Sequence, residues 1–155
     1  MDLQELSLRT GLDKRKLRYC LDHRLIPGLR IEVTQDEAGR PRKFADDVGF
    51  AIVCAAKLLE TGLPHASIRL FLQGLSEITV DGSAAPASAL ASILEHGHPA
   101  IAQFGDNVNV RLMLEEIPYN SGWRAPGNPA RLADDYEPVV VISLDIGSIR
   151  QKIFS

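Results

Sequence analysis

The side chains best suited to chemistry are cations gathered near the start of the chain. Four of the five residues after Asp13 are basic, namely Lys14, Arg15, Lys16 and Arg18. Aspartate is favoured just before a helix because its carboxylate accepts hydrogen bonds from the first free amides, so we expect a helix over residues 14–22. Cations at a helix start oppose the helix dipole. A chain that tolerates this arrangement is expected to face a polyanion, although most charge runs are solvated helix faces.

Charge is distributed unevenly along the chain. The formal net charge of −3 is unusual for a protein that binds nucleic acid. Residues 9–43, however, hold ten Lys and Arg against five Asp and Glu, whereas residues 76–155 hold five against ten. Attraction to phosphates requires a local basic surface. The composition therefore allows a DNA-binding first part and a functionally different, acidic second part.

Two short helices on either side of Gly11 must position the cations. The first is expected over residues 2–9, where Asp2 and Glu5 have the spacing of a capping box. The second buries Leu17 and Leu21, which lie one turn apart on the same face. The pattern predicts a helix–turn–helix.

Three short motifs in this region occur in the order and spacing of a known family. They are L-x-x-x-T-G-L at residues 6–12, L-R-Y at residues 17–19 and L-I-P at residues 25–27. Together they resemble the beginning of MerR-family winged-helix transcriptional regulators. The resemblance implies that the second helix enters the major groove of double-stranded DNA. It also implies that Arg18 and Tyr19 hold phosphates, and it makes Lys14, Arg15 and Lys16 candidates for base and phosphate contacts.

Two residues depart from the family's pattern. Cys20 stands where an aromatic residue is common, and Arg24 stands where glycine is usual. Glycine suits a helix end that needs a left-handed backbone. A different residue there costs on the order of 1 kcal/mol if its φ is positive.

Residues 26–44 are expected to form a hairpin wing. Residues 30–34 alternate as a strand, residues 36–39 suit a turn, and residues 40–44 return. The R-x-aromatic pair at Arg42 and Phe44 resembles the end of the family's wing. Three cations there are expected to contact a phosphate or the minor groove, namely Arg40, Arg42 and Lys43. The alternative is that they are edge charges that prevent aggregation.

Helices are expected next over residues 46–61 and 65–75, which extends the resemblance to about half of the chain. We therefore assign a winged helix-turn-helix domain to residues 1–78, with four helices and a wing. Residues 79–88 are small and polar and read as a linker. The predicted fold class is α+β.

Residues 89–155 are expected to form a small α/β region for an effector or for dimerisation. A helical stripe runs from Leu90 to Phe104 but is interrupted, and it lacks the heptads of a coiled coil. Strands are predicted over residues 108–114 and 138–146, with a long loop at 118–137 and a short closing helix at 147–154. Trp123 in the loop either forms a lid or partner anchor or covers a small core.

No motif supports an enzyme, a cofactor or a metal site, and no catalytic residues are assigned. Cys20 and Cys54 read as buried thiols of a reducing compartment. His96 and His98 are interpreted as a surface turn. The sequence contains no signal peptide and no apolar run long enough to span a bilayer, so no membrane partner is expected and a cytoplasmic location is predicted.

The prediction is a sequence-specific transcriptional regulator that binds double-stranded DNA as a homodimer on a partly palindromic site. A small molecule or protein effector could act on the second part. The alternative is a DNA-associated architectural or adaptor protein whose acidic second part recruits another protein.

Overall fold

The computed structural model describes the chain except for residues 28–41, 79–88, 107–108, 116–121, 126–127 and 133–134. The first four helices are α1 (Leu3–Thr10), α2 (Lys14–Asp22), α3 (Asp46–Glu60) and α4 (His65–Glu77). These are the four helices that the sequence predicted, with ends that differ by at most two residues. Residues 28–41 of the predicted wing lie outside the described residues, and residues 42–44 of its predicted return strand form no strand, so the winged-helix interpretation stays a prediction.

Local hydrogen bonds explain where α1 and α2 begin and end. The Asp2 carboxylate accepts from the amide of Glu5 at 2.9 Å, and the Asp13 carboxylate accepts from the amide of Arg15 at 2.8 Å. Gly11 ends α1 with a φ of 72°, a left-handed conformation that glycine adopts without steric cost. The hydroxyl of Ser7 donates to the carbonyl of Leu12 and so fixes the turn between the helices.

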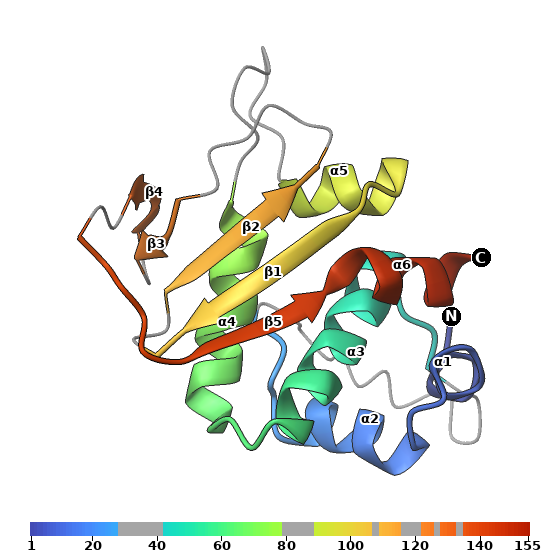
Figure 1. The fold of residues 1–155 in the computed structure, drawn as a ribbon. Coiled ribbons are helices and arrows are strands. Elements are labelled where there is room, and N and C mark those ends of the chain that lie inside the picture. Colours follow the sequence, from blue (N-terminus) through green and yellow to red (C-terminus); the bar gives the residue numbers. More distant parts are fainter. Residues whose placement is uncertain (28–41, 79–88, 107–108, 116–121, 126–127, 133–134) are drawn as a thin grey trace.

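The second part of the chain forms an antiparallel sheet of five strands in the order β4-β3-β2-β1-β5 (Figure 1). The strands are β1 (Ala100–Gly105), β2 (Val110–Leu114), β3 (Arg124–Ala125), β4 (Asn128–Leu132) and β5 (Val141–Asp145). The five strands follow one another in the chain with helices before and after them, and the sheet is antiparallel, which confirms the α+β class. The two predicted strands correspond to β2 and β5.

Two predictions about this part were wrong. The helical stripe expected over residues 90–104 ends with α5 (Ala89–His96), and Ile101 and Phe104 lie on β1. Pro99 has no amide hydrogen and disfavours helical backbone before it, and the alternation of small Ala100 and Ala102 with larger residues was too weak to reveal a strand. The loop expected over residues 118–137 contains the short strands β3 and β4.

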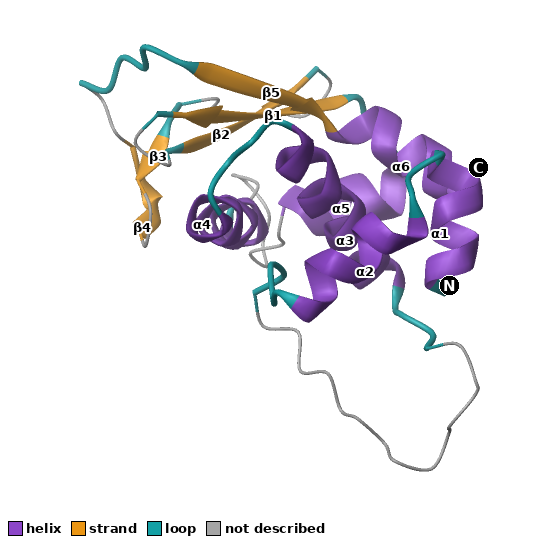
Figure 2. Ribbon diagram, turned by 90° about the horizontal axis from the view of Figure 1, so that it is seen from below, coloured by secondary structure: helices purple, strands orange, loops and turns teal. Residues whose placement is uncertain are grey.

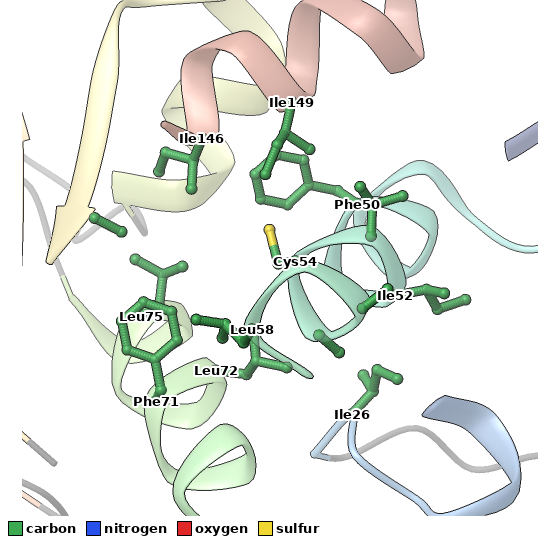
Figure 3. Close-up of a cluster of buried hydrophobic side chains, with 14 of the residues drawn as sticks. Ile26, Phe50, Ile52, Cys54, Leu58, Phe71, Leu72, Leu75, Ile146 and Ile149 are labelled. Atoms are coloured by element: carbon green, nitrogen blue, oxygen red, sulfur yellow. The ribbon is translucent and has the colours of Figure 1, made fainter. Parts of the chain in front are cut away.

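The helices lie against one face of the sheet, and the last helix returns to the first (Figure 2). Helix α6 (Ile146–Phe154), the predicted closing helix, contacts α1 and α3. Its buried residues Ile146, Ile149 and Ile153 belong to the same hydrophobic core as α3 and α4. Figure 3 shows Ile149 directly over Phe50. The predicted domain division stays a prediction, but residues from both sides of it share this core.

The backbone reverses sharply after α2. Arg24 has a φ of 52° and is the only non-glycine residue with positive φ in the described part of the chain. The amide of Leu25 donates to the carbonyl of Cys20 at 2.9 Å, which closes the helix end. This reversal turns Leu25 and Ile26 into the core, where both are buried. The condition stated for the steric cost at Arg24, a positive φ, is therefore met.

Arg24→Gly is expected to stabilise the fold by about 1 kcal/mol, because glycine removes the steric cost of the left-handed backbone. Thermal unfolding should show a rise of about 2–4 °C in the midpoint for a chain of this size. Arg24→Ala is the control, since it removes the charge but keeps the Cβ, and it should bring no gain. Equal gains from both variants would contradict this explanation.

Ile153→Ala should destabilise the whole protein by about 2–5 kcal/mol, the usual range for emptying a buried isoleucine site. Ile153 is fully buried on α6, so the cavity would open beside α1 and α3. Urea unfolding followed by helical circular dichroism should show one cooperative transition at lower urea. Loss of the sheet alone, with α1–α4 retaining wild-type stability, would show that the first part does not depend on α6.

Candidate nucleic-acid interface

Helix α2 has one buried face and one charged face. Leu17, Cys20 and Leu21 are buried against the rest of the core. The opposite face carries the predicted site residues: Lys14, Arg15, Arg18 and Tyr19 are exposed, and Lys16 is half-buried. The helix therefore presents its cations away from the protein, as a surface for a polyanion requires.

A hollow of about 350 Å³ beside α1 and α2 brings together cations that are far apart in the sequence. Its lining includes Lys14 and Arg18 of α2 and also Arg42, from the end of the predicted wing. Two backbone hydrogen bonds between Met1 and Phe44 hold this end of the segment against the start of α1. The structure thus joins one predicted wing cation to the predicted helix cations.

The hollow also has carboxylates in its wall. Asp2 and Asp22 line it together with Gln4. The hydrogen bond from the Glu5 amide lowers the pKa of Asp2, with a smaller contribution from Lys14. The side chain of Lys14 donates to Gln4 at 3.2 Å, which keeps the ammonium at the rim. The hollow therefore contains both cations and acids. Lys14, Arg15 and Arg18 also line a second depression, together with Asp13.

Lys16 is held by an acid of α3. Its ammonium lies 2.7 Å from the carboxylate of Glu60, which Lys57 also approaches at 3.4 Å. The hydrogen bond from Lys16 is the main reason that the pKa of Glu60 is lowered. Among the predicted α2 cations, Lys16 is thus the one whose charge is largely offset within the protein. Lys43 is exposed, and Arg40 lies outside the described residues.

Tyr19 belongs to a ring cluster that the sequence analysis missed. Its ring centroid lies 3.9 Å from that of His23 and 5.6 Å from that of His65, at the start of α4. The Tyr19 hydroxyl is 3.3 Å from Nε2 of His65, and Arg69 donates to the carbonyl of His23 at 3.3 Å. The four-residue spacing of Tyr19 and His23 on a helix could have revealed the first pair. The approach of His65 depends on tertiary packing.

The remaining candidates for chemistry make ring contacts with other side chains. The described residues contain no group of three or more side chains able to hold a metal ion. His96 and His98 stack with ring centroids 5.7 Å apart. Trp123 is buried, with the Arg111 guanidinium 4.7 Å from its ring centroid and Tyr136 at its edge. In the described part of the chain no helix combines the length and hydrophobicity needed to cross a bilayer.

Comparison of the chain with models of known protein families, with curated proteins and with solved structures found no match. The resemblance of residues 1–75 to MerR-family regulators therefore depends on the motifs quoted above. The arrangement of α2 on the protein surface is the structural observation that bears on function.

Both cysteines should resist thiol reagents in the folded protein. Cys20 and Cys54 are fully buried, and burial raises the pKa of the Cys20 thiol to about 11 and that of Cys54 further still. Little thiolate, the reactive form, is then present at neutral pH. A colorimetric disulfide reagent should find both thiols only after unfolding. Rapid reaction of either thiol in the native state would contradict the burial.

Proposed function

We propose that this protein is a sequence-specific transcriptional regulator that binds double-stranded DNA and resembles the MerR family. It would act as a homodimer on a partly palindromic site in the cytoplasm. The observation that carries the proposal is the exposed basic face of α2, whose other face is buried in the core. A helix anchored in this way can enter a groove without rearrangement of the fold.

The dimensions of α2 suit the major groove. An α-helix with its side chains is about 10–12 Å across, and the major groove, about 12 Å wide, admits one. Recognition helices contact base edges mainly through their first residues. We therefore assign base contacts to Lys14 and Arg15, and phosphate contacts to Arg18 and Tyr19. Lys16 is a weaker candidate because Glu60 already pairs with it.

Arg42 extends the proposed contact beyond α2. It lines the same hollow as Lys14 and Arg18, so one DNA backbone could meet both the helix and the end of the predicted wing. Lys43, the next residue, is exposed. Contacts to phosphates fix the register of a protein on DNA, while contacts to bases select the sequence. The proposed arrangement provides side chains for both purposes.

The proposal predicts different effects for two substitutions on α2. Arg18→Ala should weaken binding to all DNA sequences alike and should reduce the slope of log affinity against log salt by about one unit. Lys14→Ala or Arg15→Ala should instead relax base preference at particular positions, by roughly 1–3 kcal/mol for each lost bidentate contact. Selection from a randomised duplex pool, followed by affinity measurements at several salt concentrations, provides both readouts.

Lys152→Ala is the matched control, because Lys152 is an exposed cation on α6 that lines neither depression of the proposed contact. It should leave both the affinity and the salt slope near wild type. Equal losses from Lys152→Ala and Arg18→Ala would mean that only overall charge attracts DNA. Weak binding without any base preference would favour the architectural or adaptor role instead.

A further inference from the structure

Strand β5 forms one edge of the sheet. It pairs with β1 through five residues, from Val141 opposite Gly105 to Asp145 opposite Ile101. No other strand of the described residues lies on its outer side, and Figure 2 shows this edge in full view at the front of the sheet. An edge strand carries a row of backbone amides and carbonyls that can pair with a further strand. β5 is therefore available to extend the sheet.

Exposed apolar side chains gather at the same edge. Val139, Val140 and Val141 are consecutive in the chain and are 89%, 57% and 42% exposed. They are three of the seven large exposed hydrophobic residues in the described part of the chain, and a fourth, Ile101, lies on β1 opposite Asp145 at the other end of β5. Single exposed hydrophobic residues are ordinary, but a contiguous group is typical of a contact surface.

The valines are held in this position by a carboxylate. One oxygen of Asp106 accepts from the amide of Val139 at 2.9 Å, and the other accepts from the hydroxyl of Tyr136 at 2.5 Å. Tyr136 in turn lies over Gly105, where any Cβ would collide with its ring and hydroxyl. The exposed run is thus fixed to the end of β1 by specific contacts.

We infer that β5 pairs with β5 of a second copy of this chain, antiparallel and about a two-fold axis at Ser143. Ser143 is the middle residue of β5, so this register pairs all five residues of both strands. It places Ile142 opposite Leu144 of the second copy, and both side chains are only half-buried in the single chain. The two sheets would join, and these residues would complete the packing on the helical side.

The charges around β5 are compatible with an identical partner. Residues 138–144 contain no charge, so two copies can meet without burying an unpaired ion. An axis at Val141 would place Glu137 opposite Asp145 of the other copy, and like charges directly opposite are destabilising. The axis at Ser143 avoids this clash and places Asp145 opposite Val141. The charges thus favour the axis at Ser143 over the axis at Val141.

This inference deepens the proposed function, because a homodimer would present two α2 helices to two half-sites. It can nevertheless be tested without DNA. Covalent linkage of two chains at β5 would support this interface even if the protein bound no DNA. Conversely, DNA binding by a dimer joined elsewhere would leave the proposed function in place and overturn this interface.

The first test compares a negative and a positive side chain at the same position. Val141→Asp places an acid opposite Asp145 of the other copy at two symmetric points, whereas Val141→Lys places a cation there. Light scattering at tens of micromolar should show a dimer for the wild type and for Val141→Lys. The dissociation constant of Val141→Asp should be at least about tenfold higher than that of Val141→Lys. A monomeric wild type, or equal effects of the two charges, would overturn the register.

The second test does not depend on the effect of a charge on folding. Ser143→Cys should form a disulfide between two chains under mild oxidation, because residues directly opposite in an antiparallel pair have Cα atoms about 4.5–5.5 Å apart. Gln103→Cys is the matched control, since Gln103 is the partner of Ser143 on β1. Two such residues would lie three strand spacings apart, about 14 Å, which is too far for a disulfide. Linkage of both variants alike, or of neither, would overturn the interface.

Discussion

Helix α3 passes through the middle of the hydrophobic core, and the other helices are placed by what they bury against it. Eight of its fifteen residues are buried, including Phe50, Cys54 and Leu58. Helices α2, α4 and α6 all contact it, and side chains from each side converge around Cys54 (Figure 3). Protein interiors are close-packed and tolerate little displacement. The direction in which α2 presents its cations is therefore set by the packing of apolar residues beneath them.

This arrangement separates the chemistry of the proposed interface from the stability of the fold. The exposed cations of α2 make few bonds within the protein, so they remain available for a partner. Lys16 is different, because its ion pair with Glu60 joins α2 to the end of α3. Exposed pairs of this kind contribute little to stability, but this one limits how freely Lys16 can turn toward DNA. Arg18 carries no such restraint among the described contacts. Substitution of Arg18 therefore tests the proposed DNA contact more directly than substitution of Lys16.

Much of the first part could be predicted from sequence because its determinants are local. Asp2 and Asp13 begin helices through bonds to amides two or three residues away, and Leu17 and Leu21 reveal the buried face of α2 by their spacing. Arg24 stands at a helix end, where a left-handed residue is often needed, and its φ is indeed positive. The residues that determine these features lie within one or two helical turns of them.

The sheet was harder to predict because its determinants are distant. Half of the residues of β1 are small, and its identity as a strand comes from neighbours on both sides rather than from its own pattern. β3 pairs through two residues only, too few for a recognisable alternation. The ring cluster of Tyr19, His23 and His65 likewise joins α2 to α4 across more than 40 residues. No local pattern can indicate contacts that form only when separate elements meet.

The contact between α6 and α1 has a consequence for the way the protein is made. A guanidinium of Arg9 donates to the carbonyl of Ile153, so partners 144 residues apart in the chain meet in the finished fold. During synthesis, α1 and α3 emerge long before the helix that covers them. Their shared apolar face therefore stays in contact with water, or with chaperones, until residues 146–154 have left the ribosome. Contacts between such distant residues also slow folding, because a long loop must close before they are gained. The complete core can form only after translation of its last helix.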